Sequence, residues 1–386
     1  MIFPHTRLTL SGERFIVTYS LAAADLTSAR RRAEGICLEQ TVELPAALLP
    51  QDDIRAQVVG RLEALTPLPN QRFEAVISYA IETVGDELTQ LLNVMFGNTS
   101  MQPAIRVEQL TLPPLLLALF AGPRFGQAGL RRLLGVQQRP LLCTALKPLG
   151  LSAPELAGLA RQFALGGIDL IKDDHGLANQ PFAPFKDRVR RCAAAVAEAN
   201  QQTDQLRSLY VPNITAAPAR LLDNAWFAKE AGAGAVMIAP GLAGLDTIRQ
   251  LATDDGFGLP ILSHPALRGT LVISPEQGMS HGLVYGLLPR LTGVDASIYV
   301  NYGGRFAFTQ ANCREIVNAA EAPLGSLRPM FPTPGGGMTL ARLPEMLTFY
   351  GRDVILLIAG GLYGHSPNLL DNCRQFRAQV EALTQS

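Results

Sequence analysis

The chain has 386 residues, of which 48% are hydrophobic and 17% are charged, so it is able to bury a large core. Its 33 basic and 33 acidic side chains balance, so we expect neither nucleic acid nor a membrane as a partner. The five cysteines are widely spaced, and no apolar run approaches the roughly 20 residues of a membrane span, so we expect reduced thiols and a cytoplasmic protein.

The first part of the chain mixes two kinds of hydrophobic pattern. Segments such as RFIVTYSL and QRFEAVISYAI alternate as strands do, whereas TSARRRAEGICLEQ and DELTQLLNVMFG have helical spacing. This mixture predicts a small α+β domain, of the ferredoxin-like type, over residues 1–122.

A different pattern fills residues 123–386. Eight short apolar runs each end in a glycine, proline or polar cluster, and most are followed by a helical stretch. The runs are RPLLCTALKP, GIDLIKDD, SLYVPNITA, GAVMIAPG, LPILSHPA, ASIYVNYGG, LRPMFPTPGGG and VILLIAGGLYG. Apolar strands that alternate with helices predict a (β/α)8 TIM barrel carrying the active site. An open, doubly wound parallel sheet is the alternative.

Four adjacent ionisable residues close the second of these runs. They are Lys172, Asp173, Asp174 and His175. Barrel enzymes carry their active sites at the carboxyl ends of the strands, and the scarce residues Lys147 and His264 also follow predicted strands. Because side chains alternate along a strand, Lys172 and Asp174 are expected on one side and Asp173 and His175 on the other, until the loop breaks the alternation. The set predicts an active site, and a salt bridge between Lys172 and an aspartate is the alternative.

Two acids and an imidazole in one place suit a divalent cation, and a site with few carboxylate ligands suits Mg²⁺. Lys172 has the wrong charge for a ligand. A desolvated lysine near positive charges has a lowered pKa, however, and its neutral amine reacts with CO₂ to form an anionic carbamate. We therefore expect a metal site at the end of the second strand.

The segment GGIDLIKDDHGLANQPFAPFKDRV resembles strand two of the ribulose-bisphosphate carboxylase (RuBisCO) large-subunit superfamily, and RPLLCTALKPLGLS resembles strand one. The similarity continues in the family's order through LYVPNITA, SHPAL, TPGGGMTLARLP and AGGLYGHSPN, and covers nearly the whole chain. The resemblance implies that Lys172 is carbamylated and that Asp174 is a metal ligand. His175 stands where the family has a glutamate ligand, so the implied Mg²⁺ ligands are Lys172, Asp174 and His175.

Several positions depart from the true carboxylases. Pro265 replaces a phosphate-binding arginine, Asn301 replaces a histidine that holds the same phosphate, and RFAFTQANCREIVNAAEAPLG lacks the lysine that stabilises added CO₂. These losses resemble the RuBisCO-like proteins (form IV), which enolise without fixing CO₂. Leu146 and Pro148 align with two family lysines of strand one, and a shift of one residue would bring Lys147 to the proton-transfer position.

Enolisation makes defined demands on a site. A proton next to a carbonyl is removed at neutral pH only when the developing enolate oxygen is stabilised, which Mg²⁺ does as a Lewis acid. We expect Lys147, if neutral, as the base, with Lys172 and His264 as the other catalytic residues. Asn301 and Arg305 are the candidates for substrate contacts within the barrel. Glycine loops after strands seven and eight are expected to bind phosphate. Their residues are Gly335, Gly336, Gly337, Gly360 and Gly361.

Two functions from different classes follow. The first is a Mg²⁺-dependent enolising enzyme acting on a small phosphorylated ketose or 3-oxo sugar acid. It would be an isomerase or enolase of methylthio-sugar phosphates, or a decarboxylase or C–C hydrolase of sugar acids. The second is an inactive relative that binds a metabolite or has a regulatory role, which His175 supports because a neutral imidazole weakens a Mg²⁺ site.

The resemblance also implies a homodimer, because the family completes each active site with residues from a partner's amino-terminal domain. Glu39 in CLEQTVELP and an asparagine in LLNVMFGNTSM resemble those residues. Asn98 and Asn93 are both candidates for that asparagine. We therefore expect a homodimer with two shared active sites.

Overall fold

The computed structural model describes residues 5–203 and 207–385, and the chain divides into two compact units. The first unit contains the residues up to Phe120 together with Gly269–Val284. The second contains Ala121–Arg268 and the residues from Tyr285 onward. Within the described residues, every helix is too short or too polar to cross a membrane.

The first unit is built on a five-stranded sheet with the order β10-β4-β1-β3-β2. Its strands are β1 (Arg14–Ala22), β2 (Arg61–Leu68), β3 (Arg72–Ala80), β4 (Ile105–Thr111) and β10 (Gly278–Met279). Its helices include α1 (Leu26–Glu39), α2 (Leu88–Phe96) and α3 (Pro114–Leu117). Buried and half-exposed residues alternate along most of β1, as the pattern of RFIVTYSL predicts, and a capping box between Asp25 and Ser28 begins α1.

The short strand β10 comes from a part of the sequence that lies between two barrel strands. It pairs in parallel with β4, and Ser280 continues the pairing by donating its backbone N–H to the carbonyl of Val107. The chain therefore leaves the barrel after residue 268 and adds an edge strand to the sheet of the first unit.

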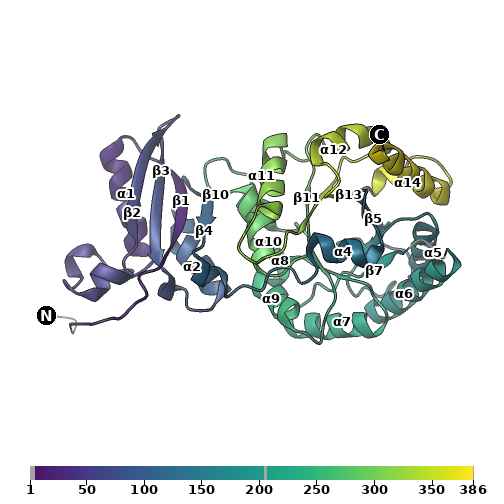
Figure 1. Cartoon of the computed structure of the whole chain (residues 1–386), viewed down its shortest axis with the longest axis horizontal. Coiled ribbons are helices and arrows are strands. Elements are labelled where there is room, and N and C mark those ends of the chain that lie inside the picture. The colour runs from purple at the N-terminus through teal and green to yellow at the C-terminus, as the bar shows by residue number, and fades with distance from the viewer. Residues whose placement is uncertain (1–4, 204–206, 386) are drawn as a thin grey trace. The chain divides into compact units, whose positions relative to one another are not determined.

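The second unit is a barrel of eight parallel strands with helices around its outside (Figure 1). The strand order is β7-β6-β5-β13-β12-β11-β9-β8, and a bridge between Asn213 and Met237 joins the two ends of this order. The strands are β5 (Leu141–Leu146), β6 (Leu170–Asp173), β7 (Leu209–Val211), β8 (Val236–Ile238), β9 (Ile261–Ser263), β11 (Ala296–Val300), β12 (Phe331–Gly335) and β13 (Ile355–Leu357). Each predicted run contains one strand, so the predicted (β/α)8 class is confirmed and the open sheet is wrong.

Apart from α4, which precedes β5, the helices of this unit follow strands, as expected for a barrel. They include α4 (Gly126–Leu134), α5 (Ala153–Leu165), α6 (Phe185–Gln202), α7 (Pro218–Glu230), α8 (Pro240–Ala243), α9 (Leu245–Thr253), α10 (Leu288–Leu291), α11 (Gln310–Glu321), α12 (Leu343–Tyr350), α13 (Gly360–Tyr363) and α14 (Leu369–Gln385). Capping boxes at Ser152 and Thr309 begin α5 and α11, respectively.

The interior of the barrel is closed by side chains near the strand starts. Leu130 and Leu134 of α4 are buried in one cluster with apolar residues of all eight strands or the residues beside them. The carboxylate of Asp295, just before β11, accepts hydrogen bonds from the backbone N–H groups of Phe125 and Gly126 at 2.8 Å each. These contacts hold the start of α4 against the amino end of the barrel.

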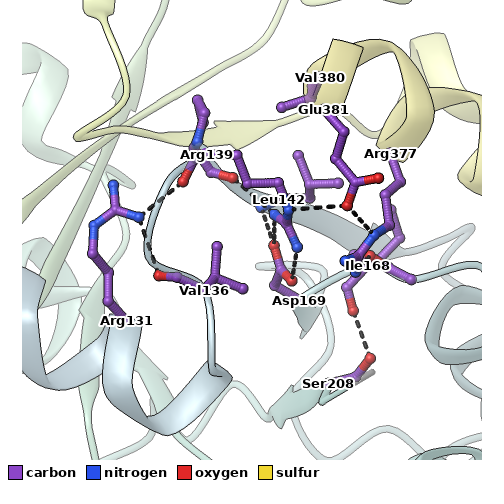
Figure 2. A network of polar contacts seen from close by, with 12 residues as sticks. Arg131, Val136, Arg139, Leu142, Ile168, Asp169, Ser208, Arg377, Val380 and Glu381 are labelled. Carbon is purple, nitrogen blue, oxygen red and sulfur yellow. Dashed lines mark hydrogen bonds and ion pairs between the residues drawn. The ribbon is translucent and has the colours of Figure 1, made fainter. Parts of the chain in front are cut away.

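A buried ion pair lies at the same end (Figure 2). Arg139 precedes β5 and Asp169 precedes β6, and their side chains form two hydrogen bonds of 2.6 and 2.7 Å. Asp169 also accepts from the backbone N–H of Leu142, and Glu381 of α14 approaches Arg139. Charges at the strand starts are thus paired within the protein, which leaves the carboxyl ends as the place for chemistry.

Candidate active site

The KDDH motif divides into residues with different surroundings. Asp173 is fully buried and accepts three hydrogen bonds, from Arg188 Nε at 3.1 Å, Tyr210 Oη at 2.8 Å and the backbone N–H of Asn213 at 3.0 Å. Burial raises the pKa of Tyr210 well above its ordinary value, so its hydroxyl stays a donor. Asp173 therefore fixes the end of β6 to α6 and β7 and is not exposed to a ligand.

Lys172 is also buried, with 2% of its surface exposed. Its Nζ donates to the backbone carbonyl of Asp173 at 2.8 Å. Burial lowers the pKa of Lys172, and the negative charges of Asp174 and Asp173 oppose this shift only in part. A larger neutral fraction of the amine favours reaction with CO₂, as the carbamate hypothesis requires.

Asp174, which follows β6, is in contact with the residue that follows the neighbouring strand β5. Lys147, which follows β5, places its Nζ 3.0 Å from Asp174 Oδ1, and His175 Nδ1 lies 3.4 Å from the same oxygen. Burial opposes ionisation of Asp174, but hydrogen bonds from His175 and Lys147 and the charge of Lys172 outweigh it and lower its pKa. Asp174 is therefore an anion within reach of two lysines.

His264 brings a third strand end, that of β9, to this group. Its ring stacks on the ring of His175 with centroids 4.8 Å apart and planes inclined by 6°. Burial, followed by the charge of Lys172, lowers the pKa of His264 to about 2, so the imidazole is neutral. The backbone N–H of Ala266 donates to His264 Nδ1 at 3.2 Å, so the ring proton lies on Nε2 and is available as a donor.

The predicted metal ligands are thus close together but form an incomplete set. Among residues 5–203 and 207–385, there is no cluster of three or more histidine, cysteine or acidic side chains that would hold a metal ion. Asp173 is turned away and paired with Arg188, which leaves Asp174 and His175. A third anionic ligand would exist only if Lys172 became a carbamate, and its burial and lowered pKa fit that requirement.

The glycine loops after β12 and β13 lie against each other. A Cβ atom on Gly361 would lie 2.5 Å from the carbonyl oxygen of Met338, and one on Gly337 would lie 2.5 Å from Gly304 Cα. Gly337 also has a φ of +67°, which favours glycine. Gly335 is buried at the end of β12, whereas Gly336, Gly337 and Gly360 are exposed. The loops therefore present open backbone at the carboxyl end of the barrel.

Asn301 and Arg305, the two candidate substrate contacts in the barrel, differ in accessibility. Asn301 is fully buried, its Oδ1 accepts from Tyr350 Oη at 2.7 Å, and its Nδ2 lies 3.0 Å from Met338 Sδ. Arg305 is exposed, and its guanidinium lies 4.9 Å from the ring centroid of Phe306. The structure thus places the Asn301 amide within side-chain packing and leaves Arg305 open to solvent.

Glu39 and Asn98 contact each other within the first unit. Asn98 Nδ2 donates to Glu39 Oε1 at 2.9 Å. The buried Gln40 holds the surrounding loop, because its Oε1 accepts from the backbone N–H of Thr99 and its Nε2 donates to the carbonyl of Asn93. The side chain of Asn93 is exposed instead, so Asn98 is the asparagine that is paired with Glu39.

Two residues near these strand ends were not singled out by sequence reasoning. Tyr363, in AGGLYG, accepts from the backbone N–H of Lys147 and donates to the carbonyl of Ala145, at 3.1 Å each. It therefore braces the end of β5 that carries Lys147. Asn213, in VPNITA, contacts the KDDH segment. Asn213, two residues after β7, carries the signal of an amide close to a strand end, whereas Tyr363 lies in α13, six residues after β13, and has no such local signal.

Comparisons with known proteins all match this chain to one family. The family model for the catalytic domain of the ribulose bisphosphate carboxylase large chain matches residues 126–386. A 5-methylthioribulose-1-phosphate isomerase of Rhodospirillum rubrum is 39% identical over 369 residues, covering 95% of this chain and 96% of the relative. A 2,3-diketo-5-methylthiopentyl-1-phosphate enolase of Bacillus pumilus is 31% identical over 379 residues, covering 95% and 92%.

A solved structure resembles the chain over both units. The crystal structure of a Rubisco-like protein from Rhodopseudomonas palustris matches with a TM-score of 0.85 and 40% sequence identity. The match covers 95% of this chain and 97% of that one.

Proposed function

The chain belongs to the ribulose bisphosphate carboxylase large-chain family, in its RuBisCO-like group, and we propose that it enolises a phosphorylated methylthio-ketose. The observation that carries the proposal is the 3.0 Å contact between Lys147 and Asp174, beside the buried Lys172. The names of the isomerase and enolase relatives support this substrate class over sugar acids. Because those relatives are named as enzymes, they also argue against an inactive binding protein.

Proton transfer next to a carbonyl is the step that a ketose-phosphate isomerase and a diketone-phosphate enolase share. We assign this transfer to Lys147 Nζ, the amine that lies at the open end of the barrel. We assign to the Nε2–H of neutral His264 a hydrogen bond to a substrate oxygen, which its neutral ring and its Nδ1 contact with Ala266 support. Asp174 Oδ1 lies 3.0 Å from Lys147 Nζ and keeps it at the site, and Lys147 acts as the base in its neutral form.

Asp174, His175 and a carbamylated Lys172 are the residues that would hold Mg²⁺. The bound cation would supply positive charge that stabilises an enolate. The negative charge that would face the cation comes from Asp174 and from carbamylated Lys172. Buried Lys172 becomes an anion only by adding CO₂, so we propose that cation binding depends on CO₂.

We assign the phosphate to the exposed glycines of the loops after β12 and β13. Their backbone is open at Gly336, Gly337 and Gly360, and backbone N–H groups that approach closely suit phosphate oxygens. After β9, Pro265 stands where true carboxylases have an arginine, and after β11, residues 305–325 contain no lysine. A substrate with one phosphate and no CO₂ fixation fits this arrangement.

We further propose a homodimer in which Glu39 and Asn98 of one subunit complete the site of its partner. Their 2.9 Å hydrogen bond supports a shared role, because the two residues come from separate segments of the first unit. A cytoplasmic location is supported by the five cysteines, which are buried and free within the described residues.

The proposal is tested by incubating the protein with Mg²⁺, bicarbonate and each of two phosphates, 5-methylthioribulose 1-phosphate and 2,3-diketo-5-methylthiopentyl 1-phosphate. Phosphorus NMR follows the products. We expect conversion of at least one phosphate, and the product shows whether the intermediate is reprotonated or released. Absence of conversion of both, by a folded and cation-bound protein, would reject the substrate class.

A further inference from the structure

Asn213 contacts the chain on both sides of Asp174. It lies two residues after the end of β7 and is 4% exposed. Its backbone N–H donates to Asp173 Oδ2 at 3.0 Å, and its side-chain Nδ2 donates to the carbonyl of His175 at 2.9 Å. Nδ2 also donates to the carbonyl of Leu177 at 3.0 Å. One residue therefore holds the side chain of the residue before a candidate metal ligand and the backbone of the residues after it.

The orientation of this amide is itself determined. Both the backbone N–H and the hydroxyl of Thr215 donate to Asn213 Oδ1, at 3.2 and 2.7 Å. Because these donors require an oxygen, the NH₂ group must face His175 and Leu177. The hydroxyl of Thr215 also accepts from the backbone N–H of Ala239 at 2.9 Å, which ties the amide to the end of β8.

The backbone N–H of Asn213 donates to Asp173, which is also buried. Asp173 is held by Arg188 and Tyr210, and Arg188 Nη1 donates to the carbonyls of Ala178 and Ala183 in the loop after β6. The loop that carries Asp174 and His175 is thus held at two places. Arg188, which is paired with Asp173, binds the carbonyls of Ala178 and Ala183, and the amide of Asn213 binds the carbonyls of His175 and Leu177. Asp173, Arg188, Tyr210 and Asn213 are all buried, and hydrogen bonds within a buried group restrict the geometry of its members.

We propose that Asn213 is a positioning residue of the cation site, which holds the backbone of His175 so that Asp174 and His175 reach one ion together. The inference rests on the proposed function, because it takes His175 as a ligand. Outer contacts of metal ligands typically change metal affinity by about 10- to 100-fold when they are removed. Asn213 touches no substrate or cation in this account.

The test compares Asn213→Ala with Asn200→Ala in the full-length protein. Asn200 of α6 forms a similar amide bridge to Ser208, the residue before β7, with Nδ2 donating to the carbonyl of Ser208 and Oδ1 accepting from its N–H. Mn²⁺ serves as the probe. Electron paramagnetic resonance measures its affinity, and pulsed measurements detect nitrogen coupling from a bound imidazole.

We expect Asn213→Ala to weaken Mn²⁺ binding by about tenfold or more and to reduce the imidazole coupling. Asn200→Ala should stay within twofold of wild type in both measurements, although it also loses two hydrogen bonds. If Asn213→Ala does not fold, Thr215→Val replaces it, since it removes the hydroxyl that orients the amide. For Thr215→Val we expect a severalfold loss of affinity.

Mn²⁺ affinity and coupling equal to wild type in the folded Asn213 or Thr215 variant would overturn the positioning role. A separate His175→Ala arm distinguishes this from failure of the site itself. If wild type shows no imidazole coupling and His175→Ala binds Mn²⁺ as tightly as wild type, the proposed ligand set fails and the inference falls with it. If wild type shows imidazole coupling and His175→Ala binds Mn²⁺ more weakly than wild type, the ligand set stands and the measurements on the Asn213 variant test its positioning role alone.

Discussion

Lys147 Nζ lies 3.0 Å from Asp174 Oδ1, across the ends of the neighbouring strands β5 and β6. The proposed base is therefore held by a carboxylate that the proposed cation also requires. Protonated Lys147 and a divalent cation are both positive, so they compete for Asp174, and Lys147 acts as a base only after it has lost that proton. Loss of Lys147 should therefore affect turnover but not weaken cation binding, whereas loss of a metal ligand should weaken cation binding.

Replacement of Lys147 by methionine should abolish turnover without weakening the cation site. Loss of a general base typically slows a reaction by about 10²- to 10⁴-fold, whereas Mn²⁺ affinity should stay unchanged or rise because a competing charge is gone. Steady-state kinetics and Mn²⁺ titration measure the two effects. Lys186→Met, at an exposed position of α6, is the matched control. Weaker Mn²⁺ binding in Lys147→Met would contradict this separation.

Lys172→Ala should remove the dependence of cation binding on CO₂. In wild type, bicarbonate should strengthen Mn²⁺ binding, because the Lys172 amine becomes an anionic ligand; the alanine variant has no amine to react. The fold should persist, since the ammonium makes one hydrogen bond, to the carbonyl of Asp173. Mn²⁺ titrations with and without bicarbonate, together with a thermal melt, test this. An equal response to bicarbonate in both proteins would refute carbamylation at Lys172.

Gly337→Ala should raise KM for the phosphorylated substrate by about tenfold or more, which corresponds to loss of one charge-assisted hydrogen bond. The new Cβ would lie 2.5 Å from Gly304 Cα, so the loop must move away from its present position. Gly135→Ala is the control, because Gly135 has φ +68° against +67° for Gly337 but open space around its Cβ. Equal KM values in the two variants would remove Gly337 from the phosphate site.

Mixing two inactive proteins, Lys172→Ala and Glu39→Ala, should restore activity if active sites are shared between subunits. Some heterodimers would then carry one site in which both residues are intact. Glu34→Ala, at an exposed position of α1, should remain active and serves as the control. An active monomer by light scattering, or no recovery despite proven subunit exchange, would argue against shared sites.

The sequence predicts the barrel well because each strand is a short apolar run that ends where the chain must leave the core. The alternation of side chains also predicts that Lys172 and Asp174 share a side while Asp173 turns away, and Asp173 is indeed paired with Arg188. β6 ends at Asp173, and the alternation holds for Asp174 but fails for His175, the second residue after the strand, whose ring lies against His264 and not on the side of Asp173.

Other features depend on tertiary contacts that no local pattern records. The edge strand β10 is two residues long and joins a sheet that is formed more than 150 residues earlier in the chain, so its sequence carries no strand signal. Asn301 has a polar side chain at a strand end, which suggests a ligand contact, yet its amide is surrounded by Met338, Met346 and Tyr350. Its part in substrate binding stays a prediction.

Exchange of a carbon-bound proton with solvent tests the central claim most directly. The protein is incubated in D₂O with Mg²⁺, bicarbonate and 5-methylthioribulose 1-phosphate or 2,3-diketo-5-methylthiopentyl 1-phosphate, and proton NMR follows the hydrogens next to the carbonyl. We predict enzyme-dependent deuterium incorporation that EDTA abolishes and that Lys147→Met lowers by about 10²-fold or more. Absence of exchange with both phosphates, or exchange that persists unchanged in Lys147→Met, would contradict the account.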